Sequence, residues 1–246
     1  MATAPMSSGQ MKELASACVE AIPADLSAET AQKWIGRKRE LGNRLRSIFM
    51  DNEVSNLSNI DLRQIYCALG MEAEYSEAIK DWSLVEDKDL WTLLVVKGVT
   101  CNKVVSVMKR LGVNFYLYTE DLDKNVTVND RDPESGSYII GFKRTVEADE
   151  VNKNLSANEL SKRSHKGITL LERLLLELGY FLAAGGHLDI NNWTLCSGSR
   201  YSGGHVPSVR WDSDYRRVRV YWYSPGLADG YLRSRSAVSL SVNPKD

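Results

Sequence analysis

One short segment of the chain gathers the residue types that nucleophilic catalysis needs. His187, Asp189, Cys196, Ser199 and His205 lie within twenty positions. Covalent catalysis uses a Ser or Cys beside a base that a third group orients. The segment therefore gives one hypothesis, a hydrolase with a histidine as its base. No nucleophile-elbow motif surrounds these residues, so the alternative is a buried cysteine with an aspartate bonded to backbone amides.

The same segment also has the composition of an anion-binding loop. Glycine and hydroxyl residues alternate over positions 197–204, and Arg200 stands among them. Backbone N–H groups in such turns can surround an anion, and a guanidinium adds a fork for phosphate or carboxylate. A phosphate-handling site is thus the second form of the enzyme hypothesis. No P-loop or dinucleotide fingerprint is present, and ordinary turns remain the alternative. We expect no metal and no cofactor, because one Cys and two His at irregular spacing do not match a zinc site.

Arginine and aromatic residues alternate over positions 187–235, a stretch without lysine. An exposed strand face of this kind could stack bases and contact phosphates, or anchor a protein partner. The alternative is a solvated sheet face on which arginine stems cover the rings. The residues expected to bind are Arg200, Arg210, Arg217, Arg219, Tyr221, Tyr223, Arg233 and Arg235.

The element that must position these residues is a helix predicted over 169–186. Thr169 and Glu172 have the spacing of a capping box, and two glycines follow the last apolar residues. Leucines cover most of its circumference, so the helix is expected at the centre of the C-terminal half. We expect its charged residues, Glu172, Arg173 and Glu177, to face water. The helix is too short and too charged to span a bilayer.

The chain before this helix changes character near position 112. Helical periodicity predicts helices over 7–21, 27–50, 58–69, 72–80, 86–97 and 100–111. The helix over 27–50 carries a basic face that could extend a binding surface. We therefore expect a mostly helical N-terminal region, 1–112.

Aromatic and branched residues predict strands after position 113. The expected strands cover 114–119, 137–145, 191–197, 206–211, 216–223 and 236–242, with a short helix over 157–163. The stretch 120–136 reads as an acidic loop, since it lacks the glycine and the glutamate of a calcium loop. The expected fold class is α+β: a helical N-terminal part followed by a mixed or antiparallel sheet packed on the central helix. The C-terminal domain is expected over 113–246.

A resemblance covers this C-terminal part. The runs TLLERLLLELGYFL and HLDINNWTLCSGSR, followed by LRSRSAVS, resemble a family of uncharacterised bacterial proteins. The resemblance extends over about 155–242. It implies one coherent unit, and it implies no activity.

Composition limits the class of protein. The chain has 43% apolar and 26% charged residues and a net charge of −1, which is typical of a globular protein. Four widely separated cysteines and a start without a signal-peptide pattern favour a cytoplasmic location. The leading hypothesis is a non-enzymatic binding protein with a nucleic-acid or protein partner and no membrane contact. The alternatives are an enzyme sited around 187–205 and a homo-oligomeric interaction protein, suggested by the acidic middle and basic end of the chain.

Overall fold

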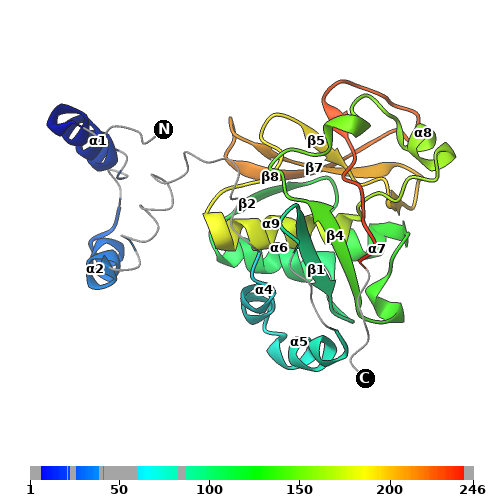
Figure 1. Cartoon of the computed structure of the whole chain (residues 1–246), viewed down its shortest axis with the longest axis horizontal. Coiled ribbons are helices and arrows are strands. Elements are labelled where there is room, and N and C mark those ends of the chain that lie inside the picture. Colours follow the sequence, from blue (N-terminus) through cyan, green and yellow to red (C-terminus); the bar gives the residue numbers. More distant parts are fainter. Residues whose placement is uncertain are drawn as a thin grey trace. The chain divides into compact units, whose positions relative to one another are not determined.

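The computed structural model describes residues 7–20, 22, 26–38, 41, 60–82 and 87–240. The chain forms two compact units, residues 1–55 and 56–246 (Figure 1). In the first unit the described helices are α1, Ser8–Glu20, and α2, Ala28–Gly36. Ser27 is the N-cap of α2, and its side chain accepts a hydrogen bond from the Thr30 amide. Positions 39, 40 and 42–50, which include most of the rest of the expected 27–50 helix and part of its basic face, lie outside the described residues, and so does position 58, the first of the expected 58–69 helix.

The second unit is an α+β fold organised around α9, Leu170–Ala184. Both bonds of the predicted capping box between Thr169 and Glu172 are present, and Gly185 ends the helix in the left-handed conformation. Every residue of α9 from Leu170 to Tyr180 is buried. The helix is covered by α4 (Leu62–Leu69), α6 (Cys101–Arg110) and strands of two different sheets. The prediction of a central helix is confirmed.

Gly179 explains how closely α4 approaches this helix. A Cβ atom at that position would lie 2.5 Å from Cγ2 of Ile60 and 2.9 Å from Cδ1 of Ile65. Glycine in a helix interior costs roughly 1 kcal/mol relative to alanine. In return, this glycine allows α4 and α9 to pack closely.

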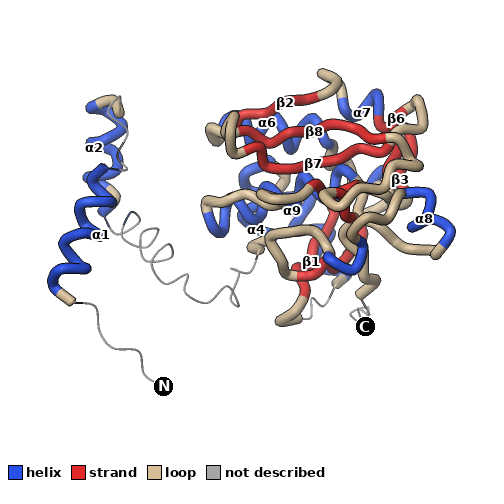
Figure 2. The backbone as a smooth tube through the Cα atoms, turned by 90° about the horizontal axis from the view of Figure 1, so that it is seen from above, coloured by secondary structure: helices blue, strands red, loops and turns tan. Residues whose placement is uncertain are grey.

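The main sheet has five strands in the order β2-β8-β7-β5-β9. Its strands are β2 (Asn114–Leu117), β5 (Trp193–Leu195), β7 (Val206–Asp212), β8 (Arg217–Tyr223) and β9 (Leu232–Arg233). The sheet is mixed, as expected: β8 is antiparallel to β7 and parallel to β2. Figure 2 shows β2, β8 and β7 running side by side. In Figure 1, β7 and β8 lie over α9 and α6.

Side chains of β8 alternate between the two faces of this sheet. Val218 and Val220 are fully buried against the helices, whereas Arg217, Arg219 and Tyr221 are only partly buried on the other face. From Arg217 to Tyr221 the strand thus alternates between buried and partly buried side chains. This alternation gives the sheet one core face and one face that carries arginine and tyrosine.

Two further sheets have two strands each. The first pairs β1 (Leu90–Val95) with β4 (Tyr138–Lys143), and the second pairs β3 (Val126–Asn129) with β6 (Ser199–Tyr201). The remaining α-helices are α5 (Glu72–Ala78), α7 (Leu122–Asn125) and α8 (Ala157–Lys162). Short 3-10 turns cover Ile79–Asp81, Pro133–Ser135 and Glu150–Asn152. The short helix expected over 157–163 is α8, and a capping box between Ser156 and Glu159 begins it.

Three sequence predictions about elements are wrong. The helix expected over 86–97 is strand β1, whose run LWTLLV is almost wholly buried. A short run that is apolar on both faces does not reveal its period, so helix and buried strand cannot be told apart. The strand expected over 236–242 is reduced to isolated bridges of Ser236 with Gly167 and Val238 with Gly141, and positions 241–242 lie outside the described residues. The stretch 120–136 contains α7 and β3 and is not simply a loop.

Position 112, where the sequence changes character, lies inside the second unit. One hydrophobic cluster joins Ile65 and Met108, before that position, to Leu174 and Val218, after it. The helices α4 and α6 and the main sheet thus share a core. The amphipathic pattern of each helix shows that it has a buried face, and the shared cluster shows what covers that face.

Tyr66 connects α4 to β1 and gives a first prediction. Its buried hydroxyl donates to the Leu94 carbonyl at 2.6 Å and accepts from the Val96 amide at 3.0 Å. Tyr66→Phe leaves both backbone groups without this partner, and we expect a loss of about 2 kcal/mol in the free energy of unfolding. Urea denaturation measures it. Tyr75→Phe is the matched control, because the Tyr75 ring stacks on Tyr66 at 5.3 Å and is more exposed. An equal loss in both variants would contradict a role for the Tyr66 hydroxyl.

Candidate functional site

The charged residues of α9 do not face water, so that prediction is wrong. Glu172, Arg173 and Glu177 are each 0% exposed. Nε of Arg173 donates to Oδ2 of Asp189 at 2.8 Å, and Nη1 donates to Oε2 of Glu177 at 2.6 Å. Charges removed from water need such partners. The charged side of α9 is therefore an internal contact surface.

Asp189 is the centre of this buried network. Besides Arg173, it accepts from Nη2 of Arg235 at 2.8 Å, from the Ala148 amide at 2.9 Å and from the hydroxyl of Thr194. Burial opposes its ionisation, but the charges of Arg235 and Arg173 outweigh burial and lower the pKa of Asp189. Because both oxygens of Asp189 already accept hydrogen bonds from these groups, neither is left to orient a catalytic histidine.

Arg235 was expected on a binding surface, and the structure buries it completely. Its guanidinium donates to the carbonyls of Thr145 and Val146 at 2.8 and 2.6 Å as well as to Asp189. Arg233 is also buried and forms an ion pair with Glu150. The ion pair of Arg233 and the carbonyl bonds of Arg235 hold β9 and the segment after it against the loops at 145–152.

The structure does not assemble the residues proposed for catalysis. His187 bonds Oε1 of Glu177 at 2.8 Å and stacks on Trp211 at 3.5 Å between ring centroids. His205 lies against Trp222. Among the described residues, no hydrogen bond joins either histidine to Cys196 or Ser199.

The two candidate nucleophiles have other partners. Cys196 is fully buried, and burial raises the pKa of its thiol. The Ser199 hydroxyl donates to Oδ1 of Asn129 at 2.6 Å and accepts from the Leu170 amide at 3.0 Å. Ser199 thereby satisfies a free amide at the start of α9. The Ser–base or Cys–base contact of nucleophilic catalysis is not formed by these residues.

Five of the other expected binding residues come together on the outer face of the main sheet: Arg210, Arg217, Arg219, Tyr221 and Tyr223. We call this surface the Arg/aromatic face. Arg210 lies opposite Arg219 on β7 and β8, and Tyr116 lies opposite Arg219 on β2 and β8. The face consists of Tyr116, Trp193, Arg210, Arg217, Arg219 and Tyr221, with Tyr215 and Tyr223 at its borders.

Guanidinium groups and rings interleave on the Arg/aromatic face. The Arg219 guanidinium carbon lies 5.2 Å from the ring centroids of Tyr116 and Tyr221 and 5.5 Å from that of Trp193. Arg217 lies 4.9 Å from Tyr116 and 4.5 Å from Tyr215. These distances are within the range of cation–π attraction. The contacts hold the two arginines over the sheet with little need for a carboxylate partner.

The electrostatics of this face favour a negatively charged ligand. The carboxylate nearest to Arg217 is that of Asp212, at 3.8 Å from Nε, and among the described residues Arg219 forms no ion pair. The Nε atoms of Arg217 and Arg219 are buried without a hydrogen-bond partner, so a ligand would accept from the Nη groups at the ends of the two side chains. The rings beside it are accessible, since Tyr116 is 36% and Tyr215 68% exposed.

Sequence reasoning missed two members of this face. Tyr116 comes from β2, a hundred positions before β8 and parallel to it, and Trp193 comes from β5. The alternation in the 114–119 strand indicates that Tyr116 points away from Phe115 and Leu117. Only the strand order places it next to Arg217 and Arg219.

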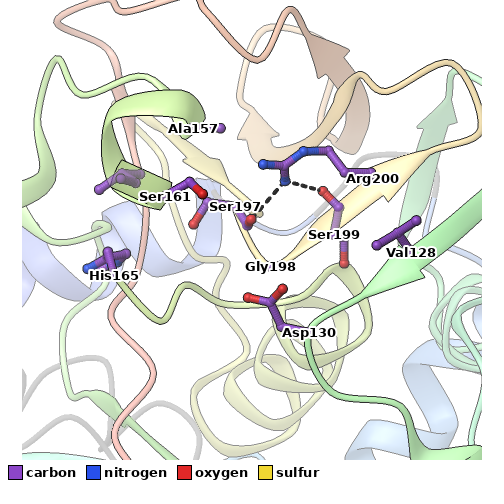
Figure 3. A pocket seen from close by; sticks show the side chains of 10 residues that line it. Val128, Asp130, Ala157, Ser161, His165, Ser197, Gly198, Ser199 and Arg200 are labelled. Carbon is purple, nitrogen blue, oxygen red and sulfur yellow. Dashed lines mark hydrogen bonds between the residues drawn. The ribbon is translucent and has the colours of Figure 1, made fainter. Parts of the chain in front are cut away.

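Arg200 lies apart from the Arg/aromatic face and lines a pocket of about 200 Å³ (Figure 3). Its Nη1 donates to the carbonyls of Ser197 and Ser199 at 2.8 and 2.7 Å. Asp130, Ser161 and His165 line the same pocket. The turn at 197–200 thus has a hollow beside it, as the anion-loop hypothesis requires, but an acidic side chain faces the hollow.

Comparisons with protein families, with curated proteins and with solved structures find no match to this chain. No described helix has the length and hydropathy needed to cross a membrane. Among the described residues, no group of three or more His, Cys, Asp or Glu could hold a metal ion. The site's own geometry is therefore the basis for a functional proposal.

Proposed function

We propose that this protein binds single-stranded nucleic acid on the Arg/aromatic face of its main sheet, without catalysing a reaction. The observation that carries the proposal is the arrangement of Arg217 and Arg219 between accessible rings. The bases of both RNA and DNA can stack on such rings, and the edges of the guanidinium groups can donate to phosphates. Stacking is worth about 1–3 kcal/mol per base.

A single strand fits this face better than a duplex does. The rings of Tyr116, Tyr221 and Tyr215 can stack only on bases whose faces are open, and a duplex hides those faces. Duplex readout would need a helix or a narrow ribbon that enters a groove, and this face is a sheet of several strands. The overall net charge of −1 means that any attraction is local to the face.

The proposal places this activity in the cytoplasm. Cys18, Cys67, Cys101 and Cys196 are free thiols, and Cys67 is exposed. An exposed thiol is compatible with a compartment that keeps cysteine reduced.

The double variant Arg217→Ala/Arg219→Ala tests the proposal. We expect fluorescence anisotropy with labelled single-stranded RNA and DNA to show binding at about 50 mM salt that weakens as salt rises. The variant should bind about tenfold or more weakly, and its slope of log affinity against log salt should fall by about 1.4, or 0.7 for each lost contact. Loss of the stacked guanidinium groups should cost only about 1–2 kcal/mol of stability.

The matched control is Arg63→Ala/Arg110→Ala, which removes two exposed arginines from helices α4 and α6. It should leave affinity and salt slope unchanged. Binding that is equally weakened by both double variants would show nonspecific attraction to the whole chain and contradict the proposal. No binding of wild-type protein at low salt would leave a protein partner as the explanation for the face.

A further inference from the structure

The pocket beside Arg200 contains two opposite charges that do not neutralise each other. Figure 3 shows Arg200 and Asp130 approaching the same hollow from two sides. The structure forms no ion pair between them, and among the described residues no hydrogen bond reaches the Asp130 carboxylate. The Asp130 amide donates to the Gly198 carbonyl at 2.8 Å, which fixes that residue at the rim.

Arg200 is oriented for a ligand. Its Nη1 is held by the carbonyls of Ser197 and Ser199, and its other nitrogens have no protein acceptor among the described residues. Burial lowers the pKa of the guanidinium, and Asp130 offsets only part of this effect. A carboxylate bound to the free edge would supply the compensation that the protein leaves incomplete.

The remaining polar groups suit a ligand that both donates and accepts. Nε2 of His165 is buried and has no hydrogen-bond partner. Burial lowers the pKa of this imidazole, so at pH 7 it is neutral and Nε2 can donate or accept according to its tautomer. Figure 3 shows Ser161 on the same side of the pocket as His165. Ala157, Leu160 and Val128 give the pocket an apolar wall.

We propose that this pocket binds a small zwitterion of the α-amino-acid type, with its carboxylate on Arg200 and its ammonium group on Asp130. A simple anion would meet the Asp130 carboxylate, and a simple cation would meet the Arg200 guanidinium. Only a ligand that carries both charges can pair with Arg200 and Asp130 at once. The volume of about 200 Å³ limits the ligand to a small molecule.

Isothermal titration calorimetry of the full chain tests this proposal. The probes are glycine, L-alanine, L-serine, L-valine and L-leucine, each compared with the matched acid that lacks the ammonium group and the matched amine that lacks the carboxylate. For L-valine these are isovalerate and isobutylamine. We expect at least one amino acid to bind saturably with a Kd of about 1 mM or lower, and its two analogues to bind at least about tenfold more weakly.

Two variants identify the pocket as the site. Asp130→Asn should weaken amino-acid binding about tenfold and bring the affinity of the acid analogue closer to it, because the repulsion is removed. Arg200→Gln should weaken the binding of both the amino acid and its acid analogue. The matched controls are Glu134→Gln and Arg163→Gln, which change exposed residues that do not line the pocket. Where Arg200→Gln lowers the melting temperature, Asp130→Asn decides alone, since among the described residues the Asp130 carboxylate accepts no hydrogen bond and its substitution by an amide keeps the shape of the side chain.

The outcomes that overturn the proposal are distinct. If none of the five amino acids binds saturably at about 10 mM, a concentration well above the expected Kd, the pocket holds no such ligand. If an acid analogue binds as tightly as its amino acid, the pocket is an anion site, and the same result with an amine makes it a cation site. Arg217→Ala/Arg219→Ala should bind the amino acid like wild type, so this test is independent of nucleic-acid binding.

Discussion

Asp189→Asn is expected to lower the free energy of unfolding by about 3–5 kcal/mol, because it leaves the buried Arg235 without a carboxylate and the buried Arg173 with Glu177 alone. Arg173 and Arg235 each donate to a different oxygen of Asp189 at 2.8 Å. An amide keeps the shape of the side chain, but one of its two acceptors becomes a donor that faces a guanidinium. Neither arginine can turn to water, since both side chains are buried.

Urea denaturation followed by tryptophan fluorescence measures this loss. Asp214→Asn is the control, because Asp214 is an exposed residue in the turn between β7 and β8. It should change the free energy of unfolding by less than about 0.5 kcal/mol. A small loss in both variants would mean that Arg173 and Arg235 keep sufficient partners in Glu177 and the backbone carbonyls.

The same residue predicts how stability depends on pH. The pKa of Asp189 is lower in the folded chain than in the unfolded chain, where it is about 3.9. Its contribution is therefore complete above pH 4 and is lost as the pH falls through the folded pKa. As the pH falls below 4, the free energy of unfolding of the wild-type protein should decrease more steeply than that of Asp189→Asn. Parallel pH profiles would contradict this assignment.

The sequence predicts the central helix well and its surroundings poorly, for a physical reason. Local signals such as the capping box of Thr169 and Glu172, and the left-handed Gly185, are properties of neighbouring residues, and both are confirmed. The burial of Arg173 depends on Asp189 and Arg235, which lie 16 and 62 positions further along the chain. Helical spacing shows that Glu172, Arg173 and Glu177 lie off the leucine face. It does not show that other charges will meet them.

The functional surfaces show the same limit. Alternation within β8 predicts that Arg217, Arg219 and Tyr221 share a face, and they do. Strand order then decides which other residues join them. It brings Tyr116 to the face, whereas Arg233 and Arg235, equally basic in sequence, are directed into the core.

The pocket beside Arg200 could be predicted only in part. Ser199 and Arg200 begin strand β6, in a segment whose glycines and hydroxyls indicate an anion site in the sequence. Asp130 enters because β3 pairs with β6, and His165 enters because the chain after α8 turns back toward the same loop. These residues lie 35–70 positions away from Arg200 and belong to no motif. The chemistry of the pocket changes with them, from an anion site to one with both charges.

Glu172→Gln should lower the free energy of unfolding by about 3 kcal/mol, because Glu172 is the buried partner of Arg131 as well as the cap of α9. Its oxygens accept from Nε and Nη2 of Arg131 at 2.6 and 2.8 Å and from the Tyr138 hydroxyl at 3.1 Å. The Thr169 amide also donates to it at 2.7 Å. An amide can keep that cap, but it cannot accept from all three neighbours. The loss should therefore come mainly from the charge contact with Arg131.

Glu159→Gln separates the two contributions. Glu159 completes the other capping box, on α8, with the Ser156 amide at 2.8 Å; it is exposed, and among the described residues it forms no ion pair with an arginine. Its substitution should cost less than about 1 kcal/mol. Urea denaturation of both variants, together with Arg131→Met and the double variant Glu172→Gln/Arg131→Met, measures the coupling between Glu172 and Arg131. Equal losses in Glu172→Gln and Glu159→Gln, with no coupling to Arg131, would show that Glu172 acts only as a helix cap. A large coupling would mean that one charge pair, Glu172 with Arg131, holds α9 to the segment before the 3-10 turn at Pro133–Ser135. Because Asp130 precedes Arg131, the same pair would then fix Asp130 at the rim of the Arg200 pocket.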